Sequence, residues 1–257
     1  MTQQSDRRLT LVLSWVAGYV DTAGFVGLNG LFTAHITGNL VVAGAEVDWA
    51  GGGDRGVWVR LAVVPVFVVA VAIATIYWRW SPATRKPRQQ RHPAHLLWLE
   101  TAYLLLFLGL GVVLIPNIGQ PVSPNTLFVV GSAGVVAMGV KNALMREALG
   151  TLAPTTVMTG NLTQFVIDMT QLLSLQCQRG NRAFILQDND SAPLKEVQQR
   201  TRKFGSALLG FVVGAVAGAL AMHWLGFWAI AFPTVATALL AIVLHQRSPP
   251  NFTLDRV

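Results

Sequence analysis

The stretch that decides the fold is Thr33-Ala-His-Ile-Thr-Gly-Asn-Leu40, because it recurs as Thr155-Thr-Val-Met-Thr-Gly-Asn-Leu162. Five of the eight positions are identical in the two copies. The segments before them also align, since Ala17-Gly-Tyr-Val-Asp-Thr-Ala23 corresponds to Ala137-Met-Gly-Val-Lys-Asn-Ala143. The offset is 120 residues in these segments and 122 at the motif, so the second copy has two extra residues in its connection. Two matching segments that occur in the same order and at nearly the same offset indicate an internal duplication.

The composition around this repeat excludes an ordinary soluble domain and a disordered chain. Of the 257 residues, 53% are hydrophobic and only 12% are charged, whereas a soluble domain has about 25% charged residues. The mean hydropathy of +0.49 predicts that the lipid bilayer is the main partner. A membrane-spanning helix needs about 20 apolar residues. Six segments meet this need: Leu9–Leu28, Leu61–Trp78, Leu96–Ile115, Leu127–Leu144, Phe204–Met222 and Trp224–Leu244.

Two further stretches, Thr33–Val47 and Thr155–Leu175, are more polar and contain the repeated motif. Full helices, broken helices and re-entrant segments all fit their composition. The charges of the loops help to choose, because Lys and Arg favour cytoplasmic loops. Residues 79–91 and 179–203 are rich in Lys and Arg, whereas residues 116–126 have no charge. Both basic loops and both termini lie in the cytoplasm only if neither motif segment crosses the membrane.

We therefore predict an all-α membrane protein with six transmembrane helices plus two re-entrant or broken helices. Because each copy has three spans, an odd number, the second copy starts on the opposite side of the membrane. The two copies are therefore predicted to be inverted-topology repeats. Residues 1–115 form the first repeat, 116–126 an external connecting loop, and 127–257 the second repeat. The polar cytoplasmic loop 176–203 interrupts the second repeat and contains a candidate amphipathic helix at 192–203.

Asp21 in the first apolar segment, followed by Phe32-Thr-Ala-His-Ile-Thr-Gly-Asn-Leu40, resembles the YoaK-like bacterial membrane family, whose function is unknown. The resemblance covers nearly the whole chain, and the His-x-Thr-Gly-Asn-Leu block is its most specific part. It implies a multi-pass protein of the bacterial inner membrane. It implies no substrate and no catalytic residue.

Asp21 is the most costly residue of the predicted spans. A carboxylate near the centre of a membrane helix costs about 2.5–3.5 kcal/mol on insertion scales. Lys141 occupies the matching position in the second copy, and inverted symmetry makes an Asp21–Lys141 pair near the midplane plausible. Three interpretations stay open: an ion or proton site, a structural pair that fixes the register of the halves, and a Lys141 side chain that reaches the cytoplasmic surface.

The repeated motifs supply hydroxyl and amide groups beside a glycine that permits a helix break. Such breaks bind ions or polar solutes in transporters. The candidate binding residues are Thr37, Gly38, Asn39, Thr159, Gly160 and Asn161, together with His35, which has no counterpart in the second copy. The alternative is that the glycines allow tight helix packing and the polar groups bond across the interface. His35 is a candidate proton-linked group or a structural residue.

Other polar and small residues have a defined spacing. Gln164 and Asp168 follow Asn161 at helical intervals, so the three share one face, which either lines a pathway or faces the cytoplasm. Glu100 is predicted to be a solvated carboxylate at the membrane interface. Gly210, Gly214 and Gly218 recur every four residues and form a packing face, within the subunit or between subunits, which leaves a homo-oligomer open.

A transporter or channel for a small polar or ionic solute is the first hypothesis, and a non-transporting scaffold or regulator is the alternative. An intramembrane protease would need Asp21 and Asp54 to face each other, but Asp54 lies in a glycine-rich loop. No metal, cofactor or phosphate-binding motif is present. The basic loops fit anionic lipid, and nucleic acid is not an expected partner.

Overall fold

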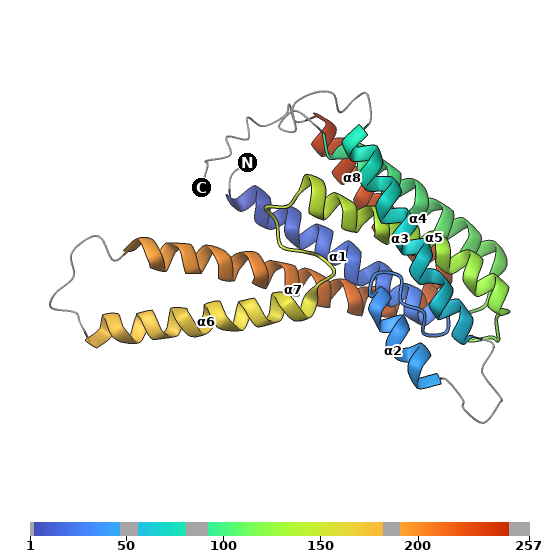
Figure 1. The fold of residues 1–257 in the computed structure, drawn as a ribbon, viewed down its shortest axis with the longest axis horizontal. Coiled ribbons are helices and arrows are strands. Elements are labelled where there is room, and N and C mark those ends of the chain that lie inside the picture. The colour runs from blue at the N-terminus through green and yellow to red at the C-terminus, as the bar shows by residue number, and fades with distance from the viewer. Residues whose placement is uncertain (1–2, 47–55, 81–91, 182–190, 247–257) are drawn as a thin grey trace.

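The computed structural model describes residues 3–46, 56–80, 92–181 and 191–246. Helices comprise 86% of this part of the chain, which contains no strand, so the prediction of an all-α protein is confirmed. The helices are α1 (Gln3–Gly27), α2 (Ile36–Glu46), α3 (Val57–Trp80), α4 (Ala94–Leu114), α5 (Pro124–Ala143), α6 (Met158–Asn181), α7 (Ser191–Leu225) and α8 (Ala231–Gln246). Figure 1 shows α2 beside the start of α3, and α6 with the start of α7 projecting from the rest of the bundle.

Five described helical segments are long and apolar enough to cross a membrane: Gln4–Gly27, Val57–Trp80, Ala94–Leu114, Pro124–Ala148 and Leu194–Gln246. The last segment contains both of the last two predicted spans. They are joined by a short 3-10 helix, Gly226–Ile230. Gly226 has a positive φ of 59°, a conformation that glycine adopts without strain, and this residue turns the chain from α7 into α8.

Neither motif segment is among the described candidate spans. Helix α2 has 11 residues and is therefore about 16 Å long, roughly half of the ~30 Å hydrocarbon core. Helix α6 has 24 residues and is long enough to cross a membrane, but it is too polar to be a candidate span. The two ambiguous stretches therefore differ in length, although each begins with the same motif.

Helices α1 and α7 are parallel and touch through their backbones. Ideal Cβ atoms built on Gly210, Gly214 and Gly218 would overlap the backbone carbonyl oxygens of successive turns of α1, those of Leu11, Trp15 and Tyr19. Gly18 of α1 is equally close to the backbone of α7. The predicted glycine face therefore packs within the subunit.

Two other helix pairs also join the two copies. Helices α3 and α5 are parallel, since Trp58 stacks near Phe128 at one end and Arg79 pairs with Glu147, just after α5, at the other. Helices α4 and α8 are antiparallel. The rings of His95 and His245 are 6.4 Å apart at one end, and the other end of α4 meets Phe227, just before α8.

The outer surface of the bundle is apolar, as a lipid-facing surface is. Large exposed side chains include Val68, Ile73, Val212, Val216 and Leu239. Among the tryptophans near helix ends, Trp80 and Trp224 are exposed but Trp78 is buried. Trp78 packs instead in a buried cluster with Leu96, Leu97 and Leu144.

The candidate amphipathic helix at 192–203 is not a separate element. It is the first part of α7, which continues without a break for 35 residues. Residues 182–190, in the middle of the predicted polar loop, lie outside the described residues, as does most of the basic loop at 79–91.

Candidate functional site

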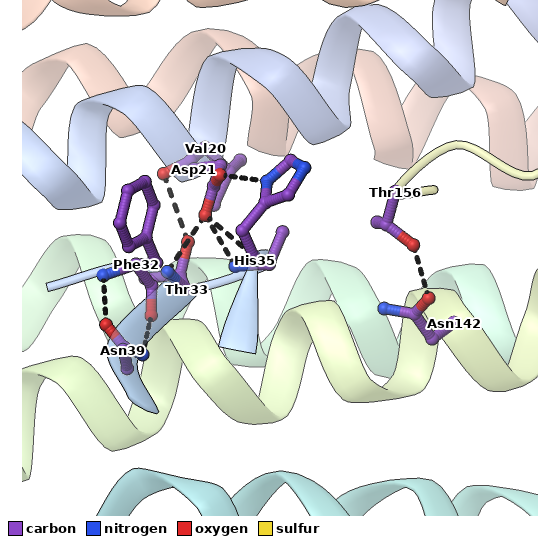
Figure 2. A network of polar contacts seen from close by, with 9 residues as sticks. Val20, Asp21, Phe32, Thr33, His35, Asn39, Asn142 and Thr156 are labelled. Carbon is purple, nitrogen blue, oxygen red and sulfur yellow. Dashed lines mark hydrogen bonds and ion pairs between the residues drawn. The ribbon is translucent and has the colours of Figure 1, made fainter. Parts of the chain in front are cut away.

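Asp21 organises the connection between α1 and α2. Its Oδ1 accepts hydrogen bonds from the backbone N–H groups of Thr33 (3.0 Å), Ala34 (2.6 Å) and His35 (3.2 Å). Its Oδ2 lies 2.5 Å from Nδ1 of His35. Figure 2 shows these contacts converging on the carboxylate. Both oxygens of the carboxylate therefore have hydrogen-bond partners, as buried polar groups require, and Asp21 is 97% buried.

These bonds hold the connection between α1 and α2 against α1. The chain turns at Asn29 and Gly30, both with positive φ, and then runs back beside α1 as far as Asp21. Helix α2 begins there, at Ile36, and leads away again. The hydrogen bond with Asp21 raises the pKa of His35, which lies between α1 and α2, above its ordinary value of 6.5. The imidazole is one third exposed and its ring lies 5.4 Å from that of Phe211 on α7.

The asparagine of each motif closes a loop of the same size. Asn39 accepts from the N–H of Phe32 (2.9 Å) and donates to its carbonyl oxygen (2.8 Å). Asn161 donates to the carbonyl oxygen of Pro154 (2.6 Å), again seven residues earlier. Pro154 has no N–H to donate, so one bond is missing in the second copy. Both asparagines are buried, and both hold the start of their helix.

The second copy has a side-chain bridge of its own at other positions of the repeat, because Asn142 aligns with Thr22 and Thr156 with Ala34. Thr156 donates to Oδ1 of Asn142 at 2.6 Å, across 14 residues of chain, and Asp21 and His35 are also 14 residues apart. Figure 2 shows the two bridges as separate groups. A π-helical turn, Leu144–Ala148, follows α5. A π turn accommodates one residue more than the α-helix, which accounts for one of the two extra residues in this connection.

The expected Asp21–Lys141 pair does not form. Lys141 donates instead to Oε1 of Glu100 at 3.0 Å, and neither of these two side chains is exposed. The prediction that Glu100 is solvated is therefore wrong. Asp21 lies about 9 Å before the end of α1, and Lys141 about 10 Å before the end of the π turn. Because these ends lie at opposite ends of the bundle, equivalent positions away from the centre do not meet.

The remaining motif residues are not gathered with the asparagines. Thr37, Thr159 and Gly160 are exposed, and Gly38 is half-buried. An ideal Cβ on Gly38 would lie 3.0 Å from the ring of Phe32, so this glycine permits tight packing of the loop. The structure therefore separates the exposed threonines from the buried asparagines of the same motif.

Two ion pairs attach α2 and α6 to their neighbouring helices. Arg60 of α3 binds Glu46 at the end of α2, with nitrogen–oxygen distances of 2.8 and 3.0 Å. Arg200 of α7 binds Asp168 of α6 at 2.6 Å. Asp168 is fully buried, and it also accepts from Gln164 at 2.9 Å. The predicted polar face of α6 therefore packs against α7.

Sequence reasoning missed Glu46, Arg60, Asn142 and Thr156. One signal was available, because Glu46 and Asp168 are separated by the same 122 residues as Asn39 and Asn161. Within the described ranges, no group of three His, Cys, Asp or Glu side chains could hold a metal ion. Asp54 lies outside the described residues.

The long apolar helices, packed around buried ion pairs, are consistent with a helical protein of the multi-pass membrane type. A family model described as "Protein of unknown function (DUF1275)" matches residues 9–243, and the chain belongs to this family. No curated protein matches the chain. No solved structure matches it either.

Proposed function

We propose that this protein is a transporter or channel for a small polar or ionic solute, built from two inverted three-pass repeats in a bacterial inner membrane. In this arrangement α1, α3 and α4 span the membrane in the first repeat, and α5, α7 and α8 in the second. Helices α2 and α6 are the re-entrant elements, and both termini are cytoplasmic.

The helix directions support inversion. Helix α1 is parallel to α7 and α5 is parallel to α3, so exchanging the two halves converts one pair into the other. Helix α4 meets its own counterpart α8 in the antiparallel direction. In a chain of six alternating spans, the first and the fifth, α1 and α7, cross in the same direction. Because each half then has three spans, the second half is inverted relative to the first.

The observation that supports a transport function is that the residues before α2 are hydrogen-bonded to Asp21, which lies partway along the apolar helix α1. Non-helical backbone at membrane depth is tolerated where it is buried in protein or lines a water-filled cavity. The partly exposed imidazole of His35 beside the buried carboxylate of Asp21 marks this connection as polar. A carboxylate, an imidazole and amide groups suit a small polar or ionic solute.

One observation favours the alternative of a non-transporting scaffold. Both oxygens of Asp21 already have partners within the chain, so this residue has a sufficient structural role. The two functions predict different responses to ligands, because a solute that binds the folded state raises the apparent stability.

The test begins with a thermal-shift screen of the purified protein against inorganic ions and small metabolites. Solutes that raise the melting temperature are then measured as radiolabelled counterflow in proteoliposomes. We expect flux that falls in Asp21→Asn and persists in Glu196→Gln, which removes an exposed carboxylate on α7. Flux unchanged in folded Asp21→Asn would remove Asp21 from the pathway, and the absence of any stabilising solute would favour the scaffold.

Topology is tested separately by thiol labelling of single cysteines placed at residues 85–91 and 116–126 in a Cys177→Ser background. The inverted arrangement requires the first group to react only from the cytoplasmic side and the second only from outside. Periplasmic labelling of residues 85–91 would overturn it.

A further inference from the structure

The two arginine ion pairs have matching acidic members, although their arginines do not share the offset of the repeat. Each joins a re-entrant helix to the long helix that follows it in the chain, α2 to α3 and α6 to α7. Their acidic members, Glu46 and Asp168, share the offset of the repeated motif. Arg60 lies near the start of α3, where it contacts the turn at the end of α1. Arg200 lies in the first part of α7, before the segment of α7 that packs against α1 through Gly210. The pairs therefore lie toward opposite ends of the bundle (Figure 1).

The Glu46–Arg60 pair is a tight closure. The guanidinium binds both carboxylate oxygens of Glu46, a bidentate geometry that is among the strongest for charged groups. It also donates to the carbonyl oxygens of Gly30 and Asn29, in the turn that follows α1. Arg60 thus fastens the end of α1, the end of α2 and the start of α3 together, and its side chain is 11% exposed.

The Asp168–Arg200 pair is looser. Arg200 reaches only Oδ1 of Asp168, and its side chain is 41% exposed. The other oxygen, Oδ2, is buried and has no hydrogen-bond partner among the described residues. A buried carboxylate oxygen without a donor is costly, so this pair holds α6 against α7 less firmly than Arg60 holds α2.

We infer that these two ion pairs are the gates of the proposed pathway, one at each end. The inference rests on the proposed transport function. With both pairs formed, the re-entrant segments are fastened at both ends and the structure is a closed state. Transport then requires the pairs to break in turn, and the Asp168–Arg200 pair, with fewer bonds, breaks first. The first opening is therefore toward the end of the bundle where α6 and α7 project.

The test uses paired cysteines in a Cys177→Ser background and a short reducible thiol crosslinker. The gate variants are Glu46→Cys with Arg60→Cys, and Asp168→Cys with Arg200→Cys. The matched control is Arg79→Cys with Glu147→Cys, because this pair joins α3 to the turn after α5 and touches neither re-entrant helix. In proteoliposomes, crosslinking either gate should reduce counterflow by about tenfold or more, reversibly on reduction, with little change in the control.

A second measurement does not require a transported solute. Amide hydrogen exchange follows local opening, so the conservative variant Arg60→Lys should accelerate exchange in residues 36–46, and Arg200→Lys in residues 158–168. The wild-type protein should exchange faster in α6 than in α2. Slower exchange in α6 than in α2 would overturn the assigned order of opening.

The outcomes separate the two proposals. If no stabilising solute crosses with the wild-type protein, transport fails, and unchanged exchange in both arginine variants then overturns the gates as well. If the wild-type protein transports and both crosslinked gates transport at the rate of their reduced forms, the gates fail while transport stands.

Discussion

Asp21 and His35 are separated by 14 residues of chain, yet their side chains meet at 2.5 Å, where one oxygen of the carboxylate faces the imidazole and the other accepts three backbone N–H groups. One buried side chain thereby fixes both the path of a loop and the start of a helix.

Asp21→Asn should destabilise the protein by about 1–3 kcal/mol. The amide oxygen can still accept from the backbone, but the charge that stabilises these bonds and the contact with His35 is lost. The measurement is the unfolding free energy in detergent, with Glu196→Gln as the control that removes an exposed charge. Equal stability of wild type and Asp21→Asn would show that the carboxylate charge is dispensable.

The contribution of His35 should depend on pH in one direction. Because its pKa is raised in the folded state, the stabilisation is full below the unfolded value of about 6.5 and is lost as pH rises through the folded pKa. The melting temperature of wild type minus that of His35→Gln should therefore shrink between mildly acidic and alkaline buffer. A difference that grows with pH would contradict the protonated pair.

Gly214→Ala should be far more harmful than Gly109→Ala. A Cβ on Gly214 would overlap the backbone of α1 at Trp15, whereas nothing lies within 4 Å of a Cβ on Gly109 in α4. We expect a loss of about 1–3 kcal/mol for Gly214→Ala and no loss, or a gain of up to about 1 kcal/mol, for Gly109→Ala. Comparable thermal stability of the two variants would show that α1 and α7 can separate at little cost.

Glu100 and Lys141 should show strong coupling. Removing one member of a buried pair leaves an unpaired charge and typically costs about 3–5 kcal/mol, so Glu100→Gln and Lys141→Met should each be strongly destabilised. The double variant should recover much of the loss, because it leaves no buried charge. A double-mutant cycle measures this coupling, and additive losses would mean that the two groups do not interact.

The class of the fold could be predicted from the sequence because bilayer length and hydropathy constrain helices directly. The glycines spaced by four residues on α7 likewise predicted a close contact, although their partner was not evident. The short link between the last two apolar segments leaves room only for a sharp turn, and Gly226 makes it with a positive φ of 59°.

The partners of the buried charges could not be predicted in the same way. The Asp21–Lys141 pair was expected from symmetry alone, but in the structure Lys141 pairs with Glu100 of α4 instead. Glu100 was expected to be solvated because it is near the start of its helix. The structure buries it completely and pairs it with Lys141, and such a tertiary contact is not visible in a local pattern.

The backbone contact between α1 and α7 has a consequence for how the protein is made. At about 5–20 residues per second, translation reaches Gly214 roughly 10–40 s after α1 has left the ribosome. During that interval the glycine-lined partner of α1 does not exist. Biogenesis must therefore leave the first helix waiting in lipid or in the insertion machinery, and a chain that stops after its first half would lack the surface against which its own first helix closes.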